Sequence, residues 1–105
     1  MTDLSSAAFL GLTSLLLGVG LFGILTRRNF ILLLIAIEIA MNAAILNFVV
    51  FAAFARSPAG LSGQSIAVVV IGLAATEVAV GLAIVLALNR LRGSINVTEA
   101  TSLKL

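Results

Sequence analysis

The sequence contains no cysteine and no histidine among its 105 residues. Without cysteine, the chain has no disulfide and no thiolate to hold zinc or an iron–sulfur cluster. Without histidine, it lacks haem ligation by that residue and its acid–base chemistry near neutral pH. Tryptophan and tyrosine are also absent, although both often anchor lipid-exposed spans at the membrane surface. Their absence indicates that neighbouring proteins, more than lipid, hold the chain in place.

Charged residues are scarce, at 10% of the chain, whereas 62% of residues are hydrophobic and the mean hydropathy is +1.30. Soluble domains usually contain about 25% charged residues. A soluble chain of this length has too little interior to hide so much apolar surface. The composition argues against a soluble enzyme, a nucleic-acid-binding protein and a disordered tail, and it predicts a chain embedded in a bilayer.

Three long apolar runs lie at about 4–26, 30–54 and 66–88. Each is long enough to cross a hydrocarbon core, which takes about 20 helical residues, and helices satisfy their backbone hydrogen bonds internally, as lipid requires. The sequence therefore predicts an all-α integral membrane protein, with three transmembrane helices in a single domain, 1–105, and a polar C-terminal tail at 89–105. The first run is too long for a signal peptide and has no basic residue before it, so we expect it to be retained.

The links between these runs are short. Arg27-Arg28-Asn29 joins the first two runs, and residues 55–65 join the last two. The second link contains Ser57-Pro58, Gly60 and Ser62-Gly63, which are typical of turns.

The basic residues predict the orientation of the chain. One side of the membrane would carry Arg27, Arg28, Arg90, Arg92 and Lys104, and the other side would carry Arg56. Because positive residues favour the cytoplasmic side, we expect the first loop and the C-terminus to be cytoplasmic and the N-terminus to lie outside.

Glu38 and Glu77 are acidic residues inside the apolar runs, where such a residue costs about 2.5–3.5 kcal/mol. Glu38 lies eight residues after Phe30, and Glu77 lies eleven residues before Leu88. At about 1.5 Å per residue, they lie about 12 and about 16 Å from the cytoplasmic edge of a core about 30 Å thick. We therefore expect both carboxyls near the midplane.

The apolar runs contain no basic residue that could neutralise these carboxyls. Unpaired burial disfavours the charged form of a carboxyl, so such a group can take up and release protons in a relay. Asn42 follows Glu38 by one helical turn, and we expect it to support Glu38 through a hydrogen bond or a shared water. Near Glu77, Ala74 and Gly81 permit close helix approach or leave room for water. The alternative interpretation is that each Glu only hydrogen-bonds to a neighbouring helix.

Three segments resemble, in order, the motifs of one protein family. They are Gly23–Asn29 (GILTRRN), Ile37–Ala43 (IEIAMNA) and Ala74–Ala83 (AATEVAVGLA). In these motifs, in length and in its three spans, the chain is similar to the K-subunit family of proton-pumping NADH:quinone oxidoreductase, respiratory complex I. The equivalent chain is called 4L in mitochondria and chloroplasts. Ile45 stands where many members carry a second asparagine.

The resemblance implies a membrane-arm subunit that is not catalytic alone. Glu38 and Glu77 would lie on the proton-translocation axis coupled to quinone reduction, and Arg27 and Arg28 would match a cytoplasmic basic pair. No cofactor or metal is expected on this chain, whereas other subunits would use quinone, iron–sulfur clusters and flavin. Its partners would be other membrane-arm subunits, including antiporter-like chains, and lipid. The membrane would be a bacterial or archaeal plasma membrane, with thylakoid and mitochondrial inner membranes as alternatives.

Other classes of protein share parts of this pattern. The small subunit of a multisubunit cation/proton antiporter has three spans but generally lacks this pair of Glu residues. Membrane-bound hydrogenases use similar subunits, so the electron donor, NAD(P)H or ferredoxin, stays open. A small multidrug transporter would need four spans, and an ATP-synthase ring subunit would need two. A purely structural assembly subunit would allow pumping without either Glu.

Overall fold

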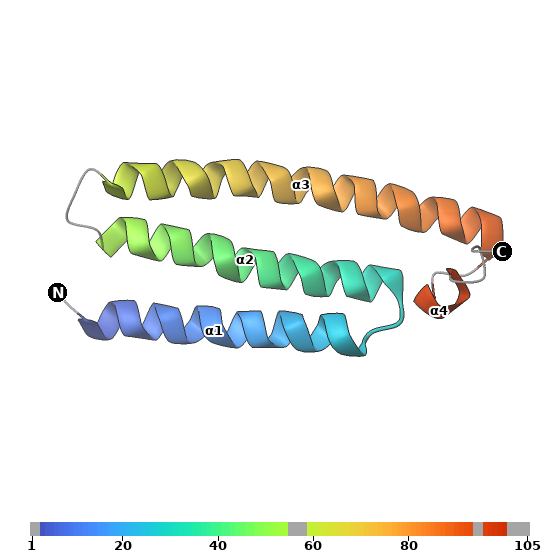
Figure 1. The fold of residues 1–105 in the computed structure, drawn as a ribbon, viewed down its shortest axis with the longest axis horizontal. Coiled ribbons are helices and arrows are strands. Elements are labelled where there is room, and N and C mark those ends of the chain that lie inside the picture. The colour runs from blue at the N-terminus through green and yellow to red at the C-terminus, as the bar shows by residue number, and fades with distance from the viewer. Residues whose placement is uncertain (1–2, 55–58, 94–95, 101–105) are drawn as a thin grey trace.

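The computed structural model describes residues 3–54, 59–93 and 96–100. Their helices are α1 (Asp3–Thr26), α2 (Phe30–Phe54), α3 (Ala59–Arg92) and the short α4 (Val97–Ala100). The three long helices run antiparallel in one layer, with α2 between α1 and α3 (Figure 1). The extents of the molecule are 56 × 24 × 17 Å. Because α1 and α3 each pack mainly on α2, the protein has little interior.

The prediction of three helices long and apolar enough to cross a membrane is confirmed. They are Leu4–Thr26, Phe30–Phe54 and Ser62–Arg92. The third helix is longer than the apolar run at 66–88. The 34 residues of α3 extend over about 51 Å, compared with a hydrocarbon core of about 30 Å. This helix therefore continues beyond the apolar run at both of its ends.

The predicted turn at residues 55–65 is wrong in its second half, because α3 begins at Ala59. Gly60 and Ser62-Gly63 are helical, whereas Ser57-Pro58 lies outside the described residues. Gly63 serves helix packing, since a Cβ added to it would lie 2.9 Å from the Ala52 Cβ. Glycine is common both in turns and at close helix contacts. Here the sequence pattern favours a turn, whereas the structure shows a close helix contact.

Helices α1 and α2 approach each other closely. A Cβ added at Gly20 would lie 2.7 Å from the Ala40 backbone nitrogen, and one at Gly23 would lie 2.6 Å from the Ala36 Cβ. Small residues permit this backbone approach, which gains van der Waals contact in a membrane where water does not drive helices together. The seam between α1 and α2 is therefore tight.

Helices α2 and α3 meet along a line of small and medium-sized side chains. Ala67, Ala74 and Val85 on α3 are buried, and Gly81 lies against Leu34 of α2. The contacts Leu34–Gly81 and Ala52–Gly63 fix the antiparallel register between the two helices.

The end of the layer that carries the first loop also carries the C-terminal segment (Figure 1). The Asn29 side chain accepts hydrogen bonds from the backbone N–H groups of Ile31, at 2.9 Å, and Leu32, at 3.3 Å, and so caps α2. Helix α3 ends at Arg92, and the next residue, Gly93, has a φ of 66°, the left-handed conformation that suits glycine. The chain then returns to the loop, where the Val97 N–H donates to the Arg28 carbonyl at 2.7 Å. Part of the predicted polar tail thus packs against the first loop.

Candidate functional site

Glu38 lies on α2, beside the contact between α2 and α3. It lines a groove whose walls are aliphatic side chains from both helices. From α2 these are Ile31, Leu34 and Ile35, and from α3 they are Val78 and Leu82. The Glu38 side chain is half-buried. The groove therefore supplies apolar walls and no cationic partner for this carboxyl.

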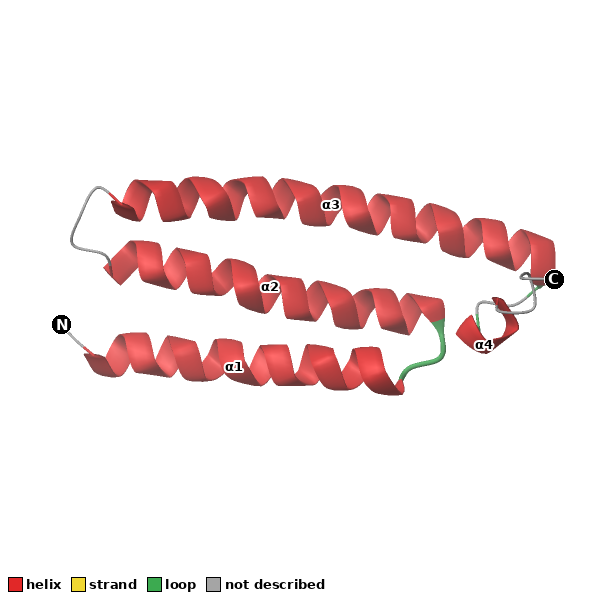
Figure 2. Cartoon of the chain, viewed as in Figure 1, coloured by secondary structure: helices red, strands yellow, loops and turns green. Residues whose placement is uncertain are grey.

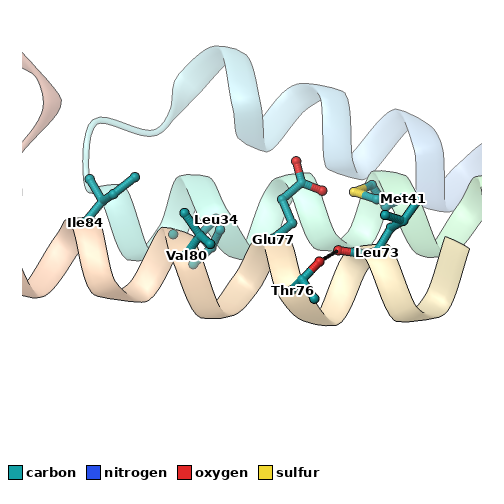
Figure 3. Close-up of a pocket in the computed structure, with 8 residues that line it drawn as sticks. Leu34, Met41, Leu73, Thr76, Glu77, Val80 and Ile84 are labelled. Atoms are coloured by element: carbon teal, nitrogen blue, oxygen red, sulfur yellow. Dashed lines mark hydrogen bonds between the residues drawn. The ribbon is translucent and has the colours of Figure 1, made fainter.

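Glu77 lies on α3 and lines a second groove between the same helices, together with Leu34, Met41 and Thr76. Its side chain extends towards α2, with Leu34 on one side and Met41 on the other (Figure 3). The Thr76 hydroxyl donates to the Leu73 carbonyl in its own helix at 2.7 Å. Glu77 itself is exposed in the isolated chain.

The helix register places the two carboxyl-bearing residues at the same level. Four residues separate Leu34 from Glu38 on α2, and four separate Glu77 from Gly81 on α3. Because Leu34 contacts Gly81 and the helices are antiparallel, Glu38 and Glu77 lie at the same level along the two helices. The Ala52–Gly63 contact gives the same register, since each Glu is fourteen residues away from it. The expected match in depth thus agrees with the packing.

The two carboxyls open on opposite faces of the layer. Successive helical residues are turned by about 100°, so Glu77 and Val78 lie on either side of the buried line through Ala74 and Val85. Val78 lines the Glu38 groove and not the Glu77 groove. The structure therefore brings the two residues to one level but places them in separate grooves.

The isolated chain does not enclose the two carboxyls, because three helices that pack mainly in neighbouring pairs have little interior. Their burial in the membrane stays a prediction. Within the described part of the chain, no direct hydrogen bond joins Asn42 to Glu38, and support from Asn42 through a shared water stays a prediction. Asn42 is exposed on its helix. Any burial of these three polar side chains must come from molecules packed against the layer.

A polar contact within the membrane spans lies away from the carboxyls. Thr13, only 1% exposed, has its hydroxyl oxygen 2.6 Å from Asn47 Oδ1, a hydrogen bond that joins α1 to α2. Asn47 is nine residues after Glu38 and faces the opposite side of α2, as the helical spacing predicts. Thr13 was not predicted as a partner. The sequence signal for this contact is a pair of polar residues at matching depths in adjacent spans.

The basic residues of the described chain gather at one end of the layer. Arg27 and Arg28 occupy the loop between α1 and α2 (Figure 2), while Arg90 and Arg92 lie in the last turn of α3. All four are exposed. The orientation prediction expects these four arginines on one side of the membrane, and they do lie at one end of the layer. Arg56, expected on the other side, lies outside the described residues.

Comparisons with known proteins agree with the three motifs. Residues 8–105 match the family NADH-ubiquinone/plastoquinone oxidoreductase chain 4L. NADH-quinone oxidoreductase subunit K of Anaeromyxobacter sp. (strain K) is 50% identical over 91 residues, covering 87% of this chain and 89% of the relative. Subunit K of Bacillus anthracis is 43% identical over 104 residues, covering 99% of each chain. The chain therefore belongs to the family of NADH-quinone oxidoreductase subunit K, or chain 4L.

Proposed function

We propose that this chain is the K subunit in the membrane arm of an NADH-quinone oxidoreductase, and that Glu38 and Glu77 hold protons in a relay coupled to quinone reduction. Family membership supports the first part. The observation that carries the second is the register, which sets two intramembrane carboxyls at one level on neighbouring helices. Ionisable groups inside membrane spans usually mark ion or proton pathways.

The separate grooves favour a relay that crosses the layer. Glu38 and Glu77 open on opposite faces, so each faces a different neighbour in the assembled complex. Protons would reach one carboxyl from one neighbouring subunit and leave from the other carboxyl to the next. We propose antiporter-like chains and other membrane-arm subunits as these neighbours, with Asn42 and bound water completing the path beside Glu38.

This arrangement also indicates that the chain works only within a complex. Three helices that pack mainly in neighbouring pairs cannot enclose a polar path, and their outer surface is covered with exposed aliphatic and aromatic side chains. In liposomes that contain the purified chain alone, we expect no proton flux above the lipid background. Glu-dependent flux from the isolated chain would contradict the proposal.

The central test replaces each carboxyl by its neutral isostere in the assembled complex. We expect Glu38→Gln and Glu77→Gln each to lower proton pumping and coupled quinone reduction about tenfold or more, because acid–base groups commonly contribute at least this much. Glu99→Gln is the matched control, since Glu99 is acidic but lies outside the three spans. Pumping and quinone reduction are measured in membranes, with assembly checked on native gels.

One result would decide against the relay, and a second would support it. If both Gln variants assembled and pumped at the rate of the Glu99→Gln control, the carboxyls would be helix-packing groups. If the variants failed to assemble, and Glu38→Asp and Glu77→Asp restored assembly but not pumping, the relay would be supported, because aspartate keeps the charge while shortening the reach.

We also propose that the first loop and the end of α3 face the cytoplasm of a bacterial plasma membrane. Four exposed arginines at that end of the layer support this orientation. The chain has no cysteine, so single cysteines at positions 28 and 64 give clean labels at opposite ends. We expect an impermeant thiol reagent to label position 64, and not position 28, in intact cells. Labelling of position 28 from outside would reverse the orientation.

A further inference from the structure

A third groove runs between α1 and α2, on the side of the layer that carries Glu38. Its apolar walls are formed by Val19, Phe22, Leu32, Ile35 and Ile39, and Arg27 lies at its end. Its floor is the close contact of Gly23 with Ala36. Ile35 also lines the Glu38 groove, so the two grooves are neighbours. The carboxyl relay does not use this third groove.

The length of this groove matches one leaflet of a bilayer. Eight residues separate Val19 from Arg27, a rise of about 12 Å along the helix. One leaflet contributes about 15 Å of hydrocarbon, half of the core. The arginine lies at the loop end of the layer, and the apolar walls lead from it towards the middle of the spans.

We propose that this groove binds one anionic phospholipid, with an acyl chain between α1 and α2 and the headgroup phosphate at Arg27. The Arg27 guanidinium is exposed and has no ion-pair partner among the residues that the structure describes. Guanidinium groups bind phosphate oxygens through paired hydrogen bonds. Arg28, Arg90 and Arg92 at the same end add positive charge that favours an anionic headgroup.

The lining of the groove fits a lipid acyl chain that ends in an anionic headgroup. Its walls are aliphatic and aromatic, and the one charged side chain among its lining residues, Arg27, lies at the loop end.

The test uses the complete complex in phosphatidylcholine nanodiscs that contain a trace of photoactivatable phosphatidylglycerol, with a diazirine on its acyl chain. After illumination, mass spectrometry locates the labelled peptides. We expect label between residues 19 and 39, and about fivefold less in Arg27→Gln. Arg27→Lys keeps the charge and should retain most of the label. Arg90→Gln is the matched control, because Arg90 is exposed at the same end but does not line the groove.

A second variant tests the apolar part independently of charge. Val19 is 58% exposed at the deep end of the groove, so Val19→Phe should fill the groove, keep assembly intact and reduce the label. Equal labelling of Arg27→Gln and Arg90→Gln, or equal labelling by a phosphatidylcholine probe, would overturn the proposal. A photo-crosslinking residue at position 22 that captured another subunit instead of lipid would also overturn it. The proton role of Glu38 and Glu77 does not enter any of these outcomes.

Discussion

Helix α2 packs against its two neighbours in different ways. Towards α1, glycine meets backbone, because a Cβ at Gly20 would lie 2.7 Å from the Ala40 nitrogen. Towards α3, Gly63 meets the Ala52 Cβ at one end of the seam, but near the carboxyls glycine meets the end of a flexible side chain, because a Cβ at Gly81 would lie 2.8 Å from Leu34 Cδ1. The first contact cannot adjust without moving a helix, whereas the second adjusts by rotating one leucine.

The polar groups are divided between these two seams in a corresponding way. The tight seam carries the buried hydrogen bond between Thr13 and Asn47, which fixes the depth of α1 relative to α2. The adjustable seam carries Glu38 and Glu77, each beside an open groove. Groups that exchange protons with neighbouring subunits must be reachable through an open groove. A buried hydrogen bond such as that between Thr13 and Asn47 needs no such opening. The α1 side of α2 therefore holds a structural contact, and the α3 side holds the two carboxyls of the proposed relay.

The largest expected effect comes from moving the Glu38 carboxyl between the two seams. Glu38→Gln combined with Asn42→Glu shifts the carboxyl one turn along the same face, and we expect partial pumping. Glu38→Gln combined with Ala40→Glu instead places it against Gly20 in the tight seam. We expect that variant to lose pumping and to assemble poorly, because the carboxyl would collide with α1. Proton pumping and native gels measure both effects.

A third placement serves as the control for this pair. Glu38→Gln with Leu34→Glu also moves the carboxyl by one turn, but Leu34 packs against Gly81. We expect less pumping than with Glu at position 42, because the new side chain must fit against α3. Equal pumping by all three relocated variants would show that the position of the carboxyl around α2 does not matter.

A smaller effect is expected from adding one methyl group to each seam. Gly20→Ala should destabilise the protein by about 1–3 kcal/mol, the usual cost of overpacking. Gly81→Ala should cost about 0.5–1.5 kcal/mol or less, the cost of a strained leucine rotamer. Gly18 has no atom near its added Cβ, so Gly18→Ala should be neutral or gain up to about 1 kcal/mol in helix propensity. Thermal dissociation of the chain from the purified complex gives this order, and an equal loss for Gly20→Ala and Gly81→Ala would remove the distinction between the seams.

The sequence predicts the helices and the depth of the carboxyls better than their directions. Run lengths and the rise per residue are enough to place Glu38 and Glu77 near one level, because both properties are local to each helix. The grooves depend on how the helices rotate against each other. These helices are apolar on every side, so the sequence has no polar face from which that rotation can be read. The burial of Glu38 and Glu77 within the isolated chain also could not be predicted, since it depends on whether the three helices form a bundle or a layer.

A further small effect tests the hydrogen bond of the tight seam. Thr13→Val keeps the shape of the side chain but removes the hydroxyl, which leaves the Asn47 carbonyl oxygen without this partner. We expect a loss of about 0.6 kcal/mol and at most about 1.7 kcal/mol, the average and the maximum measured for hydrogen bonds between membrane helices. Ser14→Ala is the matched control, because the exposed Ser14 hydroxyl donates to the Leu10 carbonyl of its own helix and, among the described residues, joins no other helix. In the same dissociation assay, Ser14→Ala should change little. If Thr13→Val behaved like Ser14→Ala, glycine packing alone would hold α1 to α2. If Thr13→Val cost more and pumping stayed normal, the tight seam would be structural, as the comparison requires.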